Sequence, residues 1–192
     1  MQKWKAVLKG NNKRLGVWAL CFVAFLFFSF TSTDKITPRL QQKLNAAVQS
    51  TFELETFALE LIEVSADVDA RTKVVLNGEH LFRVTEGDVL SGYAYLGQAP
   101  SMKDVFDYVV LFNPDLSIKK SKVLIYRENY GRQIGSQRWL KQFIGKRSGD
   151  PLTYGETIDA ISGATISAKS MTKAVAEVLE SITVLQREGV VQ

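Results

Sequence analysis

The stretch IDAISGATISAKSMTKAV, residues 158–175, joins a small, hydroxyl-bearing turn to a segment that has the apolar spacing of a helix. From residue 171 onward apolar side chains recur at steps of three and four, which predicts an amphipathic helix packed on a core. The apolar positions of this face are Met171, Ala174, Val175, Val178, Leu179 and Ile182.

The turn before this helix has the composition of an anion site. Gly163 has no Cβ and so allows a tight turn, and the small side chain of Ala164 leaves room for a ligand to approach. Three hydroxyls lie within these six residues, those of Ser162, Thr165 and Ser167. A helix N-terminus leaves backbone N–H groups unpaired and carries partial positive charge, so it accepts a phosphate readily. The alternative is that Thr165 or Ser167 is only the N-cap of the helix.

Upstream of the turn, apolar residues alternate with a period of two, which predicts half-buried strands. The predicted strands are 54–64, 80–85, 89–97, 105–112 and 122–128. The sequence NPDLS, residues 113–117, predicts a turn that joins the last two strands, with Pro114 fixing the backbone and Asp115 capping it.

Two further helices are predicted around these strands. Thr37 is a candidate N-cap and Pro38 a first helical residue for a segment that continues to about residue 52. A short helix is predicted to end at Gly145. It places on one side Trp139, Leu140, Phe143 and Ile144. Together these elements predict an α+β fold, in which helices pack on one antiparallel sheet.

The N-terminal region has the charge and apolar pattern of a membrane-insertion signal. Residues 1–14 carry five bases and no acid, and residues 15–30 are uncharged and strongly apolar. A basic flank before an apolar run holds the N-terminus in the cytoplasm, so we expect residues 15–33 to be one N-terminal transmembrane helix, with a cleaved signal peptide as the alternative. The predicted organisation is a basic cytoplasmic segment at 1–14, an anchor at 15–33, a membrane-proximal helix within 34–53, and a folded domain at 54–192.

Charge, cysteine and histidine content exclude several functions. The net charge is +4, and the five bases of residues 1–14 leave the rest at −1, which argues against nucleic acid as a partner. The only cysteine, Cys21, lies in the apolar run, so disulfides, iron-sulfur clusters and c-type haem attachment are not expected in the body. His80 stands alone, which disfavours zinc sites and Ser-His-Asp triads, and we expect it to be a surface strand residue.

The segment DAISGATIS, Asp159 to Ser167, resembles the flavinylation motif D-x-x-[ST]-G-A-T-x-[ST] of the FMN-binding domain family, and every motif position matches. That family includes flavin-carrying components of the Rnf complex and of the sodium-translocating NADH:quinone reductase. The resemblance implies covalent FMN, joined through its phosphate to the hydroxyl of Thr165 by a flavin transferase. It also makes cofactor-site candidates of Asp159, Ser162, Gly163, Ala164 and Ser167. Asp159 is either part of the recognition sequence for the transferase or a plain turn acid.

The stretch from FDYVVLF to KVLIYRENYGRQIGSQRWLKQFIGK is most similar to the stand-alone bacterial members of this family. It departs from the Glu-Thr-Pro-Gly-Leu-Gly loop of the members that work within those two complexes, for which Glu128 is the one candidate match.

Aromatic and charged residues near the motif are further candidates. Aromatic side chains that could stack on the flavin ring are Tyr130, Trp139, Phe143 and Tyr154. The alternative for Trp139 and Phe143, four residues apart, is helix core. Residues 129–149 carry five bases and no acid, and they are either an anion or partner site or a solvated face. Arg127 and Glu128 are either site residues or a surface pair.

The sequence therefore predicts a membrane-anchored, extracytoplasmic (periplasmic) flavoprotein that relays electrons through FMN on Thr165. The resemblance implies a flavin transferase and membrane or soluble redox proteins as partners, and the predicted anchor adds the membrane itself. No G-x-G-x-x-G fingerprint follows a predicted strand, so no direct NAD(P)H site is expected. The alternative is a non-redox binding module whose SGAT turn caps a helix or binds phosphate.

Overall fold

The computed structural model describes residues 36–191. Helix α5, Thr165–Arg187, occupies the C-terminal segment, as its apolar periodicity predicts. All six apolar positions predicted for its inner face are buried. Because full burial of a Val, Leu, Ile or Met side chain contributes roughly 1.5–3 kcal/mol, this face is a major source of stability for the domain.

Five strands form one antiparallel sheet in the order β1-β2-β3-β4-β5, so each strand pairs with the next along the chain. They are β1 (Ala58–Leu61), β2 (Leu81–Glu86), β3 (Val89–Pro100), β4 (Val105–Phe112) and β5 (Ile118–Ile125). The α+β class and the antiparallel sheet predicted from the sequence are confirmed, and β4 has the predicted limits.

Other strand limits differ from the prediction. Only Ala58–Leu61 of the predicted 54–64 strand pairs with β2, because this edge segment is mostly exposed and has no neighbour on its outer side. Strand β3 continues to Pro100, opposite Val105 of β4. Strand β5 begins at Ile118, four residues before the predicted start, because Ile118 pairs with Phe112 directly after the turn.

The predicted turn at 113–117 is confirmed. The Asn113 N–H donates to the Ser117 carbonyl at 2.9 Å. The Asp115 carboxylate accepts the Ser117 N–H at 3.0 Å, which is the local bond of an Asx turn.

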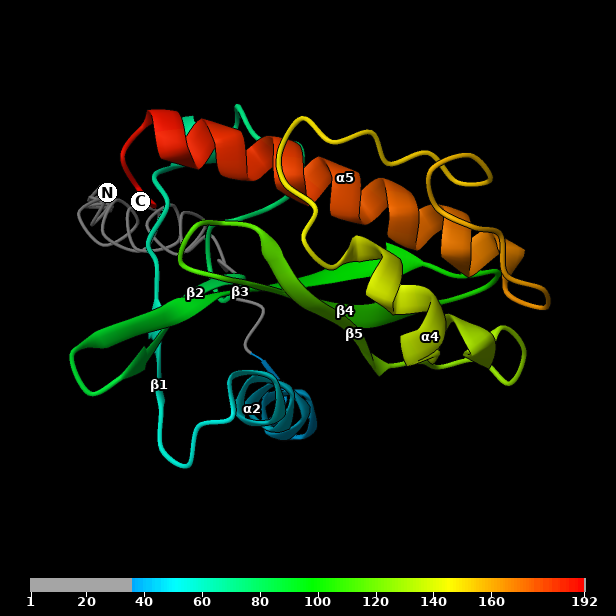
Figure 1. Cartoon of the computed structure of the whole chain (residues 1–192), viewed down its shortest axis with the longest axis horizontal. Coiled ribbons are helices and arrows are strands. Elements are labelled where there is room, and N and C mark those ends of the chain that lie inside the picture. The colour runs from blue at the N-terminus through cyan, green and yellow to red at the C-terminus, as the bar shows by residue number, and fades with distance from the viewer. Residues whose placement is uncertain (1–35, 192) are drawn as a thin grey trace, which may run out of the picture. The chain divides into compact units, whose positions relative to one another are not determined.

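The sheet is covered on both faces (Figure 1). Helix α5 lies along one face, where it packs on the aromatic side chains of β3 and β4. Helix α2, Pro38–Phe52, lies on the other face and buries Leu44, Ala47 and Val48 there. Alternation along β3 and β4 divides their side chains between the two cores, so Tyr95 faces α5 and Leu96 faces α2.

Helix α2 begins as the sequence predicts, because Thr37 is the N-cap, its hydroxyl accepts the Leu40 N–H, and Pro38 is the first helical residue. The remaining helical segments are short: α3 (Ala66–Asp69), η1 (Arg132–Gly135), α4 (Gln137–Leu140) and η2 (Lys141–Phe143). The helix predicted before Gly145 is therefore split into α4 and η2. Ile144, predicted on its inner side, is 52% exposed.

The predicted anchor at 15–33 lies outside the described residues. Among the helices of residues 36–191, none combines the length and the apolar character that crossing a membrane requires.

Candidate flavin site

The N-terminus of α5 is not capped by a side chain. Thr165 is the first helical residue, Ala164 occupies the N-cap position, and no side chain bonds to the first turn. The first intrahelical bond runs from the Ala168 N–H to the Ala164 carbonyl at 2.8 Å. The backbone N–H groups of Thr165, Ile166 and Ser167 have no acceptor within residues 36–191. The first turn carries no acid either, so this end of the helix is a free, partially positive site.

Gly163 gives the turn its shape. Its φ is +78°, and a Cβ at this position would lie 3.1 Å from the Gln133 side-chain amide. Both the left-handed backbone and the close neighbour favour glycine. The next residue, Ala164, is buried, so the chain enters α5 with no bulky side chain over the first turn.

The three hydroxyls of the turn have different environments. Ser167 is buried, and its hydroxyl bonds to the Tyr126 hydroxyl at 3.0 Å. Thr165 is exposed, and Ser162 is exposed as well. The capping alternative for Thr165 and Ser167 is therefore wrong, since neither hydroxyl bonds to a backbone N–H of the first turn.

Thr165 lines a hollow of about 190 Å³ at the end of α5. Its walls come from the turn and first residues of α5 and from the segments that follow β3 and β5. The residues outside the turn and helix are Met102, Tyr126, Glu128, Tyr130 and Gly131. The rim is apolar and open, because Met102, Tyr130 and Ile166 are 59%, 85% and 51% exposed. An exposed apolar rim beside a polar helix end suits an amphipathic ligand that has an anionic group.

Glu128 shapes one wall of this hollow. Its carboxylate accepts the Lys103 N–H at 2.8 Å, the Asp104 N–H at 3.2 Å and the Ser101 hydroxyl. These bonds, led by the one from the Lys103 N–H, hold the Glu128 pKa below its usual value. Glu128 thereby fixes the turn between β3 and β4 that presents Met102 to the hollow.

Trp139 and Asp159 lie on the other side of the turn, where they line a separate hollow of about 530 Å³ together with Ser162. The Trp139 indole N–H donates to the Asp159 carbonyl at 2.6 Å, and the Asp159 N–H donates to Gln142 at 2.8 Å. Trp139 is 5% exposed and meets Phe143 edge-on at 5.4 Å. It therefore anchors the backbone of the motif, and its role in cofactor binding stays a prediction.

The Asp159 carboxylate is exposed and makes no hydrogen bond or ion pair with the described part of the chain. It therefore has no capping function in residues 36–191. Recognition of Asp159 by a flavin transferase stays a prediction.

The other aromatic candidates are dispersed. Phe143 is fully buried in the core beside Trp139, and Tyr154 lies under the Lys169 ammonium at 5.8 Å. Only Tyr130 of the predicted stacking residues lines the Thr165 hollow. The bases of the run 129–149 do not all face one site, since Arg147 pairs with Asp115 at the β4–β5 turn.

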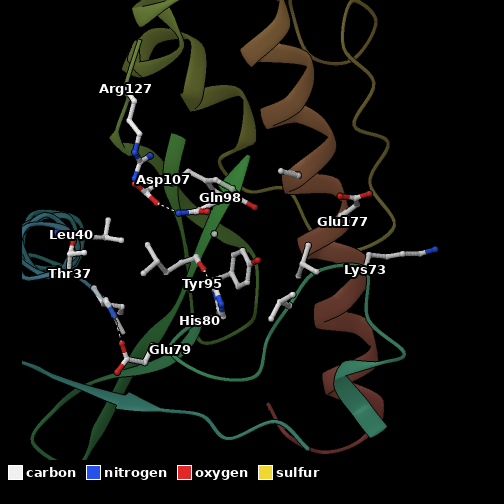
Figure 2. A pocket seen from close by; sticks show the side chains of 17 residues that line it. Thr37, Leu40, Lys73, Glu79, His80, Tyr95, Gln98, Asp107, Arg127 and Glu177 are labelled. Carbon is white, nitrogen blue, oxygen red and sulfur yellow. Dashed lines mark hydrogen bonds and ion pairs between the residues drawn. The ribbon is translucent and has the colours of Figure 1, made fainter. Parts of the chain in front are cut away.

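Arg127 and Glu128 point into different cavities. Arg127 lines a cavity of about 790 Å³ beside the start of β2. It donates to the Asp107 carboxylate at 2.6 Å, and Figure 2 shows the two side chains facing one another. The same carboxylate accepts the Gln98 side-chain N–H at 2.7 Å. Asp107 is 1% exposed, so this pair is a buried structural contact, and Arg127 and Glu128 are not a surface pair.

His80 lines the same cavity, and the prediction of a surface strand residue is wrong. It precedes β2, is half-buried, and donates its Nδ1–H to the Leu96 carbonyl at 2.8 Å (Figure 2). Its ring stacks on Tyr95 at 6.4 Å between centroids. This contact fastens the start of β2 to β3.

Sequence reasoning missed Tyr126, Met102 and Gly131 in the hollow at Thr165. A partial signal existed for Gly131, a glycine after the last strand. Its φ is +82°, and a Cβ there would collide with the Tyr126 hydroxyl. Met102 comes from the β3–β4 turn, and only the strand pairing brings that turn to α5.

Residues 102–180 match the family described as the FMN-binding domain. Over this range the chain is similar to an FMN-binding domain. Every residue that lines the two hollows beside the SGAT turn lies within the matched range.

Among solved structures, the chain is similar to NqrC of Shewanella oneidensis, with 21% sequence identity and a TM-score of 0.44. The alignment covers 64% of this chain and 62% of that one, so less than two thirds of NqrC is matched. No curated protein sequence matches the chain.

Proposed function

We propose that this protein is a membrane-anchored, extracytoplasmic flavoprotein that relays electrons through FMN attached by a phosphoester to Thr165. One observation carries the proposal: the exposed Thr165 hydroxyl stands at the uncapped N-terminus of a 23-residue helix, within the range that matches the FMN-binding domain. Ser167 is buried and bonded to Tyr126. Ser162 lines the other hollow. Thr165 is thus the one motif hydroxyl that is both exposed and inside the hollow.

The attachment is a phosphoryl transfer from FAD. The Thr165 oxygen forms a bond to the phosphorus of the FMN half, the pyrophosphate bond of FAD breaks, AMP leaves, and the hydroxyl proton is released. The product is a phosphodiester with one negative charge. It would lie at the free N–H groups of Thr165, Ile166 and Ser167, where the helix end favours an anion. A flavin transferase is the required partner.

The hollow at Thr165 would hold only part of the cofactor. Sites for drug-sized ligands span roughly 300–1,000 Å³. At about 190 Å³, the hollow suits the phosphate and the adjoining chain of FMN. The isoalloxazine ring would then extend over the exposed apolar rim of Met102, Tyr130 and Ile166. A ring held in this way stays accessible to a redox partner, which suits a relay.

When bound, FMN supplies one- and two-electron chemistry, and the protein supplies position and environment. A covalent bond is useful outside the cytoplasm, because dissociated FMN would be lost there. The apolar run at 15–33 and its basic flank support the proposed anchor and orientation. Electrons would come from a membrane partner and pass to another carrier.

The test is intact mass and in-gel flavin fluorescence after full denaturation, with the full chain co-expressed with a flavin transferase. Wild type should gain the mass of one FMN less one water, and Thr165→Ala should lose both the mass and the fluorescence. Ser162→Ala and Ser167→Ala are matched hydroxyl controls that should keep both. A wild type that stays unmodified beside a flavinylated positive control would refute the attachment. Retained label in Thr165→Ala would refute the assignment of the acceptor.

Electron relay needs its own measurement. The flavinylated wild type should bleach with dithionite and recover its yellow colour on addition of an oxidised carrier protein. A flavin that dithionite cannot reduce would contradict the relay even if the covalent bond is present.

A further inference from the structure

Helix α2 and strand β5 together carry five bases and no acid. They are Arg39 and Lys43 of α2 and Lys119, Lys120 and Lys122 of β5. The two elements are neighbours, since the Lys122 ammonium donates to the Ser50 hydroxyl at 3.4 Å and the Lys119 ammonium lies 5.4 Å from the centre of the Phe52 ring. We call these five residues the α2–β5 basic face.

The charges of the basic face are not compensated within the described part of the chain. None of the five bases forms an ion pair with residues 36–191. The pKa of Lys122 is lowered, first by partial burial and then by the positive charges of Lys120 and Lys43. These lysines are thus close enough to repel one another.

Elsewhere in the described part of the chain some bases form ion pairs with acids, and others, such as Arg138, Lys141 and Lys169, form none. The pairs include Arg71 with Glu188, Arg83 with Glu60, Arg147 with Asp115 and Lys173 with Glu177. Lysines on an edge strand also discourage strand pairing between molecules, and β5 is an edge strand. That role explains the β5 lysines, but it gives no reason for Lys43 on α2 to add a further like charge beside them. A surface of this kind favours an anionic partner.

The position of the face along the chain favours lipid as that partner. The predicted anchor ends at residue 33, and α2 begins at Pro38. The five Cα–Cα steps from residue 33 to residue 38 span at most roughly 18 Å, so an anchored chain keeps α2 near the membrane surface. Clusters of lysine and arginine close to a membrane anchor bind anionic headgroups.

We propose that the α2–β5 basic face docks on anionic phospholipid headgroups of the membrane that holds the anchor. The proposal rests on the membrane-anchored part of the proposed function. Helices α2 and α5 lie on opposite faces of the sheet (Figure 1). Docking through α2 therefore holds the α5 face, with Thr165, on the side of the sheet turned away from the lipid. A carrier that exchanges electrons with the flavin would approach from the aqueous side.

The test uses the full chain in vesicles of phosphatidylcholine, with or without phosphatidylglycerol, that carry a quencher on a headgroup. A fluorophore is placed at Ala46→Cys on the exposed side of α2, or at Glu180→Cys on α5, in a Cys21→Ala background. The α2 label should be quenched only with phosphatidylglycerol, and the α5 label should not be. In about 1 M NaCl, where charges are screened within roughly 3 Å, the quenching should disappear.

The decisive variant removes three charges from the face, as Lys43→Gln, Lys120→Gln and Lys122→Gln combined. Each base near an anionic surface favours binding about fivefold, so the ratio of docked to undocked protein should fall on the order of a hundredfold. A control with Lys73→Gln, Lys173→Gln and Arg187→Gln makes the same charge change on the α5 side and should dock like wild type.

Equal quenching with and without phosphatidylglycerol, or unchanged quenching in the lysine variant, would overturn the proposal. The first result would leave an acidic protein as the partner of the face, and the second would leave only protection of the β5 edge. The proposed function is tested separately in the same samples. Flotation with pure phosphatidylcholine vesicles at high salt reports on the anchor, and in-gel fluorescence reports on Thr165.

Discussion

Substitution of Gly131 by alanine tests whether the Tyr126 hydroxyl is fixed in the wall of the hollow at Thr165. Gly131 has a φ of +82°, and a Cβ there would collide with the Tyr126 hydroxyl. Gly145 is a matched control, because its φ is +79° and a Cβ there would meet nothing within 4 Å. Both variants bear the backbone strain of alanine in a left-handed conformation, and only Gly131→Ala adds the collision.

The magnitudes follow from these contacts. Left-handed strain costs about 1–2 kcal/mol, and the smaller entropy of the unfolded chain returns about 0.4–1 kcal/mol. Gly145→Ala should therefore lower the free energy of unfolding by about 1 kcal/mol. Gly131→Ala also displaces the Tyr126 hydroxyl from the buried Ser167, which adds about 1–3 kcal/mol for the unsatisfied group. Its total should be about 2–4 kcal/mol.

A double-mutant cycle isolates the collision. Tyr126→Phe removes the hydroxyl, and the nearest remaining ring atom would lie 3.4 Å from the new Cβ, which is an ordinary contact. In the Tyr126→Phe background, Gly131→Ala should then cost only about 1 kcal/mol, like the control. Urea denaturation followed by far-ultraviolet circular dichroism gives all the values. If Gly131→Ala and Gly145→Ala are equally destabilising in the wild-type background, the Tyr126 hydroxyl is not held there and the description of this wall is wrong.

Three further predictions concern the carboxylates of Glu128, Asp107 and Asp159. Because the pKa of Glu128 is lowered, its contribution to stability is complete above about pH 4.5 and is lost as the pH falls through the folded-state pKa. Lowering the pH should therefore loosen the turn at 101–104, as followed by NMR. Glu128→Gln should loosen the same turn at neutral pH. Asp107→Ala leaves the guanidinium of Arg127, which is 33% exposed, without its buried partner, and should lower the free energy of unfolding in urea by about 2–3 kcal/mol. Replacing both residues with apolar ones should lower it less. An equal loss in the two variants would show that the unpaired charge of Arg127 is not the source of the cost. Asp159→Asn should change stability by less than about 0.5 kcal/mol, since its carboxylate is unbonded, yet should abolish flavinylation measured by in-gel fluorescence; normal flavinylation would remove recognition as its role.

Local patterns in the sequence predicted most of the elements. The period-two run at 105–112 became β4, the turn residues at 113–117 formed their expected bonds, and the apolar steps after residue 171 became the buried face of α5. Each of these features depends on residues that lie close to one another in the sequence. Thr37 and Pro38 succeed for the same reason, because capping is a property of a few adjacent residues.

Contacts between distant segments could not be predicted in this way. Glu128 meets the turn at Ser101, 27 residues earlier, and Tyr126 meets Ser167, 41 residues later. The meander of the sheet, with its irregular pairing between β4 and β5, sets which residues face one another at these ends. The spacing of Trp139 and Phe143 was compatible with either a cofactor wall or a core, and only their burial distinguishes the two.

The choice among three hydroxyls depends on packing and not on the motif alone. Thr165 and Ser167 are two residues apart at the start of a helix, so their side chains point about 200° apart around the axis and one must face inward if the other faces outward. Ser167 belongs to the buried face of α5 that continues through Ala168 and Met171, so the packing of this face sets which of the two side chains faces inward. The Tyr126 hydroxyl, directly after β5, gives the buried Ser167 hydroxyl its hydrogen-bond partner. The packing that removes Ser167 from solvent therefore also leaves Thr165 exposed. A chain with the same nine-residue motif but without a hydroxyl at position 126 would keep this orientation and lose the partner that the Ser167 hydroxyl has here.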